Sequence, residues 1–286
     1  MVPPLGWRSF VLGWHLDPAP ATLIVLSAGL YLAGVRRLTR GPAGARWPLA
    51  RTAAFLGGLA VLAYATCSGV ARYDTVLLSM HALQHVELGM AGPFLLALGA
   101  PITLALQASR RPTQVVLLRI LHHRVVAVLT NPVVTWTLFA GTLFGYYFSP
   151  LLDLSLRNAA VHALVHLHVV VVGMLFWWPA VGIDQARRPL PNPARLLYVL
   201  LGVPLHAFMG LAVLSSTAHP LGAAEYARVR RTWGPSPIAD QRTAAGIMWA
   251  AGELLGAIAA GVVAVRWVRE ERRRDARYDR VTSDAG

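Results

Sequence analysis

Long hydrophobic runs separated by short polar stretches make up most of this 286-residue chain. Seven apolar segments can be distinguished, at residues 21–35, 52–70, 75–98, 132–150, 159–180, 195–216 and 243–265. A helix rises about 1.5 Å per residue, so roughly 20 apolar residues cross the hydrocarbon core of a bilayer. The segments approach or exceed this length, which predicts an all-α, polytopic membrane protein with seven transmembrane helices.

The composition agrees with this fold class, because 56% of the residues are hydrophobic and only 14% are charged. An ordinary soluble domain is less apolar and more charged. In a membrane protein the formal net charge of +13 indicates arginine-rich loops, and we expect no nucleic-acid partner. The expected organisation is an extracytoplasmic segment at 1–20, a seven-helix domain in the lipid bilayer at 21–267, and a disordered arginine-rich tail at 268–286.

Arginines gather in alternate connections between the segments, and this sets the predicted orientation. They are frequent at 36–51, 110–124 and 187–195 and in the tail at 266–280, whereas most other connections carry few. Because cytoplasmic loops are rich in positive charge, the N-terminus is predicted outside and the C-terminus in the cytoplasm. The four arginines between 228 and 242 are the exception to this pattern.

Histidines recur inside three apolar segments, where a polar group is costly unless it has a partner or a function. They are His81 and His85 in the third segment, His162, His166 and His168 in the fifth, and His206 in the sixth. With the predicted orientation, a rise of about 1.5 Å per residue puts all of them roughly 6 to 16 Å below the outer surface. The sequence therefore predicts one layer of imidazoles in the outer half of the membrane.

The spacing of these histidines indicates a metal site. His81 and His85 are four residues apart, as are His162 and His166, so each pair shares one face of its helix. Two such pairs can present several nitrogens to one ion, and imidazole suits copper, zinc and iron. His168 is turned by about 200° from His166 and is a weaker candidate.

Other side chains near this depth are candidates for a supporting role. Met80, Met248 and Cys67 would supply sulfur, which favours Cu(I). Glu87 and Glu253 are carboxylates that could orient imidazoles by accepting their second N–H. We treat these five as additions to the histidine set.

Three other functions use the same residues. A b-type haem needs one histidine from each of two facing helices, such as His85 and His166, so a haem-binding electron carrier is an open alternative. A copper or proton transporter would also place histidines inside the membrane. A scaffold would use them only for hydrogen bonds between helices.

Several short motifs in a fixed order carry a resemblance to a known family. They are Trp14-His15-Leu16-Asp17-Pro18, Tyr31-x-x-Gly34, Trp47-Pro48 with Arg51, Met80-His81-x-x-Gln84-His85, Leu98-Gly99-Ala100-Pro101, Asn131-Pro132, His162-x-x-x-His166-Leu167-His168, Phe176-Trp177-Trp178-Pro179, Gly182-x-Asp184, Pro204-x-His206-Ala207-Phe208, and Asp240-Gln241 with Gly246-x-Met248-Trp249. Together they resemble the seven-span cytochrome c oxidase assembly factor family called CtaG, over nearly the whole chain.

The resemblance implies an assembly factor for a haem-copper cytochrome c oxidase that binds or delivers copper on the outer side, rather than an enzyme. It implies copper as Cu(I), with oxidase subunits and a copper chaperone as partners, in the plasma membrane of a bacterium. The ligands it carries over are His81, His85, His162, His166 and His206. Asp240 and Gln241 are carried over as positions near the outer mouth, expected to gate the site or attract cations. Glu87 departs from the family pattern, which is apolar after the second histidine.

Overall fold

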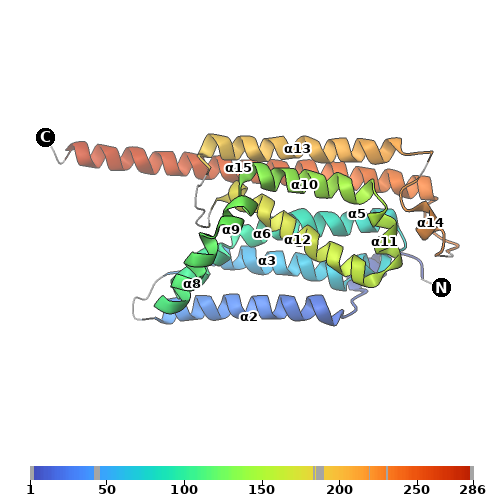
Figure 1. Ribbon diagram of the computed structural model, residues 1–286, viewed down its shortest axis with the longest axis horizontal. Coiled ribbons are helices and arrows are strands. Elements are labelled where there is room, and N and C mark those ends of the chain that lie inside the picture. The colour runs from blue at the N-terminus through green and yellow to red at the C-terminus, as the bar shows by residue number, and fades with distance from the viewer. Residues whose placement is uncertain are drawn as a thin grey trace.

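The computed structural model describes residues 3–41, 46–182, 184, 190–218, 220–229 and 231–283, with side chains up to residue 276. Arg187 and Arg188, part of one predicted cytoplasmic connection, lie outside the described residues. The elements, shown in Figure 1, are α1 (Trp7–Leu12), α2 (Pro18–Arg40), α3 (Leu49–Cys67), α4 (Gly69–Tyr73), α5 (Leu78–Val86), the π-helical turn η1 (Glu87–Ala91), α6 (Gly92–Leu98), α7 (Pro101–Ala108), α8 (Arg111–Leu121), α9 (Arg124–Leu129), α10 (Pro132–Tyr147), α11 (Leu151–Arg157), α12 (Ala159–Val181), α13 (Asn192–Ser215), α14 (Ala223–Tyr226) and α15 (Pro237–Ser283).

The described residues form helices and connections without any strand, which confirms the all-α prediction. Six helical stretches are long and apolar enough to cross a membrane, namely 18–40, 49–73, 78–108, 159–181, 192–215 and 237–276. The predicted span that is not among them is the fourth, at 132–150, which corresponds to α10 and has only 16 helical residues. The chain is thus a multi-pass membrane protein, while the count of seven spans and the orientation stay predictions.

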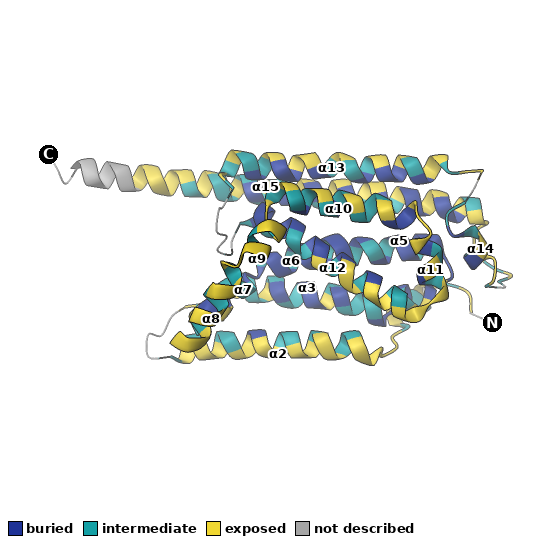
Figure 2. Cartoon of the chain, in the orientation of Figure 1, coloured by how far each residue is buried: buried dark blue, intermediate teal, exposed yellow. Residues whose placement is uncertain are grey.

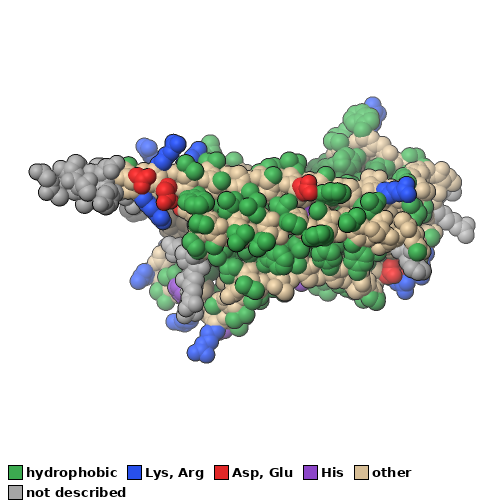
Figure 3. Space-filling view, turned by 90° about the horizontal axis from the view of Figure 1, so that it is seen from above, with side chains coloured by type: hydrophobic (Ala, Val, Ile, Leu, Met, Phe, Trp, Pro, Cys, Tyr) green, Lys and Arg blue, Asp and Glu red, His purple; other side chains and the backbone are tan. Residues whose placement is uncertain are grey.

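The outer surface of the bundle has the distribution of side chains that a bilayer requires. In Figure 3 hydrophobic side chains cover the middle of the visible face, and arginines gather near the end where α15 protrudes. α2 packs only against α3 and α7 among its main neighbours, and Figure 2 shows that most of it is exposed. Tyr31, the buried residue of α2, donates a hydrogen bond to the Gly99 carbonyl at 2.8 Å. One anchored tyrosine on an otherwise exposed apolar helix fits a helix surrounded by lipid.

The arginine-rich C-terminal region differs from its predicted disorder. α15 is 47 residues long and continues to Ser283, so residues 268–283 are helical. This part of the sequence alternates acidic and basic residues at spacings that face each other on a helix. Directly before this stretch, Trp267 donates its indole N–H to Glu271 one turn later.

The centre of the bundle is the broken helix formed by α5, η1 and α6. α3 packs against α6, α15 packs against α5, and α12 packs against both η1 and α6. η1 contains a hydrogen bond from the Gly92 N–H to the Glu87 carbonyl, five residues earlier. Pro93 follows directly and has no N–H to donate, which favours an irregular turn at this point. The consequence is that residues after Glu87 face directions that a regular α-helix would not give them.

Candidate metal centre

Four histidines from two helices form a compact group, which we call the histidine cluster: His81 and His85 on α5 and His162 and His166 on α12. The ring centroids within the helices are 4.4 Å apart for His81 and His85 and 4.2 Å apart for His162 and His166. Between the helices they are 5.5 Å apart for His81 and His162 and 5.7 Å apart for His85 and His166. The two predicted pairs therefore face each other across the α5–α12 contact.

Asp74 lies at the edge of the histidine cluster. Its Oδ2 lies 3.8 Å from Nε2 of His162. Among the described residues, Asp74, His162 and His166 form a group whose ligand atoms all lie within 4.8 Å of one another. Asp74 is only 4% exposed, and this burial raises the pKa of its carboxyl to about 7, against the opposing effect of hydrogen bonds from Gln84 and Thr75.

A chain of hydrogen bonds fixes the protonation of His81. Ser155 donates its hydroxyl proton to the Leu152 carbonyl at 2.7 Å, so the Tyr146 hydroxyl, 2.7 Å away, must donate to Ser155 Oγ. The Tyr146 oxygen can then only accept from Nε2 of His81, at 2.9 Å. A neutral imidazole carries one N–H. Nδ1 of His81 is therefore left with a lone pair that can bind a metal.

Each histidine of the cluster has a buried ring nitrogen without a hydrogen-bond partner. These atoms are Nδ1 of His81 and Nε2 of His85, His162 and His166. Buried polar atoms are nearly always hydrogen-bonded, so four exceptions in one place call for an explanation. A metal ion that accepts these lone pairs would provide it, and the residues present fit such an ion.

The ends of α5 and α12 are fixed by side chains that hold the two histidine pairs at one height. Both carboxylate oxygens of Asp240 on α15 bind the start of α5: Leu78 N–H donates at 2.7 Å and the Ser79 hydroxyl at 2.5 Å. Asn158 Oδ1 accepts from the N–H groups of Ala160 at 2.9 Å and Val161 at 3.2 Å, at the start of α12. Such caps satisfy N–H groups that a helix cannot pair internally.

Asp240 and Gln241 thus have a structural role, while the expected gating or attraction of cations stays a prediction. Asp240 has no oxygen free of the α5 contacts. The Gln241 amide donates to the carbonyls of Val213 and Ser216, both at 2.9 Å, and its oxygen accepts from the Leu221 N–H at 2.8 Å. Gln241 therefore closes the end of α13 and ties the following connection to α15.

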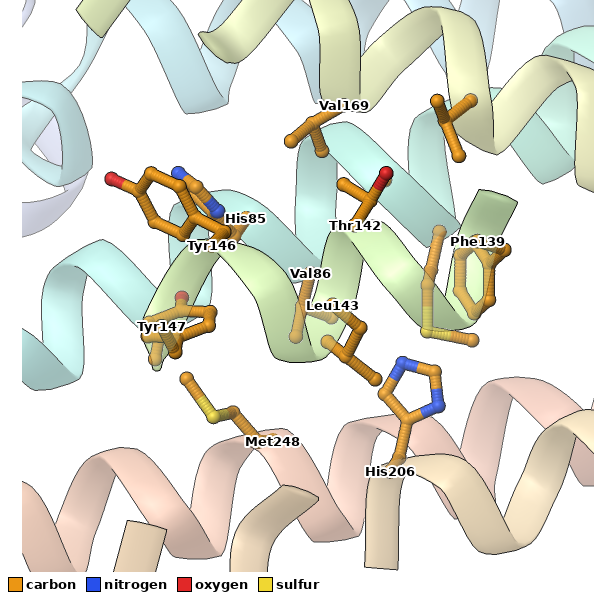
Figure 4. A pocket seen from close by; sticks show the side chains of 14 residues that line it. His85, Val86, Phe139, Thr142, Leu143, Tyr146, Tyr147, Val169, His206 and Met248 are labelled. Atoms are coloured by element: carbon orange, nitrogen blue, oxygen red, sulfur yellow. The ribbon is translucent and has the colours of Figure 1, made fainter. Parts of the chain in front are cut away.

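His206 does not join the histidine cluster, although it was predicted with it. It lies on α13, is 3% exposed, and its ring neighbour is Phe139, at 5.7 Å between centroids. Figure 4 shows His206 and His85 well apart among the side chains that line one cavity, with Met248 beside Tyr147. The prediction considered depth along the helix, which stays untested, and not the lateral distance across the bundle.

Three further candidates lie away from the cluster. His168 is exposed, and its Nε2 is 2.9 Å from the Thr142 hydroxyl. Met80 packs with Tyr73 and Leu77 rather than beside the imidazoles. Cys67 is buried, and its Sγ is 3.6 Å from the Thr66 hydroxyl.

The two predicted supporting carboxylates are also placed elsewhere. Glu253 is exposed on α15 and accepts a hydrogen bond from the indole of Trp249, one turn before it. Glu87 begins η1, which packs against α3 as well as α12. Its Oε2 is buried without a hydrogen-bond partner, so it does not orient a cluster imidazole through that atom.

Sequence reasoning missed Asp74, Tyr146 and Ser155 as parts of the site. Asp74 lies in the turn between α4 and α5, shortly before the helix that carries His81, so its closeness in sequence to that histidine was the available signal. Tyr146 and Ser155 lie on α10 and α11, and no spacing in the sequence relates them to α5. Their place beside His81 depends on how the helices pack.

Comparisons with known proteins agree with the resemblance to the CtaG family. The model of the cytochrome c oxidase caa3 assembly factor family matches residues 29–270. Uncharacterized proteins of Mycobacterium bovis and Mycobacterium tuberculosis are each 36% identical over 275 residues, which is 93% of this chain and 41% of theirs. One of Mycobacterium leprae is 36% identical over 286 residues, 97% of this chain and 43% of its own.

The chain spans about two fifths of the length of these curated relatives. No solved structure matches it significantly. The family match covers most of the sequence and includes both histidine pairs, Asp74 and His206. This chain therefore belongs to the family of cytochrome c oxidase caa3 assembly factors.

Proposed function

We propose that this protein binds copper at the histidine cluster and Asp74, and that it delivers the metal to a haem-copper cytochrome c oxidase during assembly. The observation that carries the proposal is the set of four buried imidazole nitrogens without hydrogen-bond partners, one from each histidine of the cluster. They come from two helices whose facing rings are 5.5 and 5.7 Å apart.

The donor set suits a metal that is held and then released. Asp74, His162 and His166 form a part of the site whose ligand atoms lie close together. His81 and His85 lie beside the two histidines of this group. Imidazole nitrogens are good copper ligands, and a carboxylate compensates part of the charge of the ion. Because protons compete with metal for such ligands, a change of environment at a partner protein can promote release.

The site lies toward the end of the bundle opposite to the arginine-rich connections. In Figure 1 the ends of α5 and α12 that carry the cluster lie near α11 and α14, far from α8 and the protruding end of α15. Under the positive-inside rule this is the extracytoplasmic side of a bacterial plasma membrane. Oxidase subunits and a copper chaperone would meet the protein there, and its role is one of delivery rather than catalysis.

A haem at His85 and His166 is less well supported than a single ion. The cavity beside His85 has a volume of about 50 Å³. Pockets that bind ligands of drug size measure roughly 300 Å³ or more, and a haem is at least as large. The described helices would have to separate before a macrocycle could enter.

The test is copper binding by purified full-length protein and two variants. In His81→Ala/His162→Ala, which removes one ligand from each helix, we expect copper per chain to fall by at least half. His168→Ala is the matched control, because it removes an exposed histidine of the same α12 that is outside the cluster. Unchanged copper in the double variant, or equal loss in the control, would contradict the assignment.

The same variants test delivery in cells that need an oxidase. We expect His81→Ala/His162→Ala to leave the oxidase present but poor in copper, while His168→Ala leaves it normal. Visible spectra of the purified protein distinguish the haem alternative, which predicts a reducible Soret band. Movement of copper into vesicles that contain the protein would instead indicate a transporter.

A further inference from the structure

A cavity of about 530 Å³ lies beside α14, at the end of the bundle opposite to the protruding end of α15 (Figure 1). Its mouth is formed by exposed residues of the connection before α15, among them Thr232 and Ser236. Its floor is formed by buried residues, among them Leu78 and Asp240. The cavity therefore leads from the surface to the start of α5, the helix that carries one histidine pair of the cluster.

Tyr226 lies between this cavity and the histidine cluster. The residue lines the cavity, and it packs against the buried core to which Tyr146 belongs. Its hydroxyl donates to the Asp74 carbonyl at 3.3 Å, and the Asp74 carboxylate lies 3.8 Å from Nε2 of His162. One side chain thus connects the cavity to the edge of the cluster.

An ion can reach the cluster only if a side chain moves. The unpaired ring nitrogens of all four histidines are buried, and Asp74 is 4% exposed. Entry from the lipid side would take a charge through hydrocarbon at high cost. Tyr226 is half-buried and belongs to α14, a helix of four residues in a connection outside the spanning stretches. Connections of this kind move more readily than spanning helices do.

The position of α14 depends on contacts that can open without unfolding of the bundle. Glu225 pairs with Arg157 at 2.8 Å and with Arg228 at 3.2 Å. These arginine side chains are 49% and 65% exposed, so the pairs hold α14 only weakly. Gly222, directly before α14, has a φ of 64°, and a Cβ there would lie 2.8 Å from the ring of Tyr226. Glycine therefore permits both the left-handed turn and the close approach of the ring.

We propose that this cavity is the entrance through which copper reaches the histidine cluster from the aqueous phase, and that Tyr226 is its gate. The proposal rests on the proposed copper function. When α14 moves outward, the Tyr226 ring leaves its place beside Asp74, and the carboxylate is the first ligand that the ion meets. The ion then passes to His162 and His166, whose ligand atoms lie close to that carboxylate. Return of the ring closes the cluster to water.

The experiment measures the rate at which full-length, detergent-purified protein takes up copper and the rate at which it releases copper to an excess of chelator. In Tyr226→Ala we expect both rates to rise by about tenfold, because opening no longer exposes an aromatic ring to water, while the Kd stays unchanged. Tyr226→Phe keeps the ring and should change the rates less. Tyr64→Ala is the matched control. Tyr64 is also half-buried and donates its hydroxyl to a backbone carbonyl, that of Phe10 at 3.1 Å, but it does not line the cavity.

A thiol at the mouth of the cavity tests the route without removal of Tyr226. The chain has one cysteine, Cys67, which is buried, so a new exposed cysteine can be modified selectively with a bulky maleimide. Modification of Thr232→Cys, at the mouth, should slow copper uptake. Modification of Ala224→Cys should not, because Ala224 is exposed on α14 but does not line the cavity.

The outcomes separate the entrance from the copper function on which it rests. Wild-type protein that binds no copper would overturn both proposals. Bound copper with equal rates in Tyr226→Ala and Tyr64→Ala, or copper uptake that modified Thr232→Cys does not slow, would overturn the entrance alone. Faster release from Tyr226→Ala without faster uptake would show that Tyr226 stabilises the bound ion, and this result would also refute the gate.

Discussion

The hydroxyl of Tyr146 offers the sharpest test of the site, because its neighbour Tyr147 provides a control of equal size. Both rings contact His81, at centroid distances of 5.7 and 6.2 Å. The Tyr146 hydroxyl joins His81 Nε2 to Ser155 Oγ, whereas the Tyr147 hydroxyl is buried without a partner. Tyr146→Phe therefore breaks the chain that fixes His81, and Tyr147→Phe removes a hydroxyl that bonds to nothing.

The size of the effect follows from the bonds that are lost. Tyr146→Phe leaves a buried N–H and a buried hydroxyl oxygen unpaired, which costs about 1 to 3 kcal/mol of stability. In a protein of this size each kcal/mol shifts Tm by roughly 2 to 4 °C. The hydrogen bond that favours the metal-binding form of His81 is worth about 0.5 to 1.5 kcal/mol, so copper affinity should fall by roughly 2- to 13-fold.

The assay combines thermal unfolding in detergent with a competitive copper titration. Tyr146→Phe should lower both Tm and affinity, and Ser155→Ala should change them in the same direction. Tyr147→Phe should leave affinity unchanged and Tm equal or slightly higher. Equal weakening by the two tyrosine variants would show that ring packing, and not the hydroxyl, matters. No change in affinity for Tyr146→Phe would refute the argument that His81 binds metal through Nδ1.

The remaining predictions concern the edges of the site. Asp240→Ala removes the cap of α5, so it should lower the free energy of unfolding by about 0.5 to 2 kcal/mol and weaken copper binding. Asp240→Asn can still accept a hydrogen bond from the Leu78 N–H and should lose less stability. Copper affinity should rise with pH by up to about tenfold per unit below pH 7 and more slowly above it, because the ion competes with the proton of Asp74, whose pKa is about 7. Three groups face Asp74, namely His162, His166 and Tyr226, and protons also compete with copper for the two histidines. A copper titration of Asp74→Asn at several pH values therefore isolates the contribution of the carboxylate. An unchanged pH profile in that variant would contradict the prediction. Glu253→Gln should leave copper binding unchanged, because the exposed carboxylate bonds to Trp249 and not to an imidazole.

The sequence was sufficient for those features of the fold that depend on the chain locally. Apolar runs gave the long helices, and the four-residue spacing gave two histidine pairs that indeed face each other across α5 and α12. The position along each helix also predicted that the two pairs lie at one level, and their rings do lie side by side, while their depth in a bilayer stays a prediction. Periodicity and rise per residue are properties of one helix, so they can be derived without knowing its neighbours.

The rest of the site depends on contacts between helices, which no local pattern encodes. His206 lies across a cavity from His85 because α13 packs on α15. Glu253 is turned outward by its position on α15. Asp240 caps α5 by accepting a hydrogen bond from Leu78, which lies 162 positions away in the sequence. In each case the rotation of the helix about its axis determines which neighbours the side chain contacts.

The position of Asp74 explains why a carboxylate belongs to the site and how replacement of its neighbours should act. Asp74 lies outside the spanning stretches, at the edge of the histidine cluster, where its carboxylate compensates part of the charge of an arriving ion. The cost of burying charge increases with depth in a membrane, so the ion should stay where this carboxylate is in reach. His85 and His162 both belong to the cluster, so His85→Ala and His162→Ala should each weaken copper binding, and the loss should be larger for His162, whose Nε2 lies 3.8 Å from Asp74.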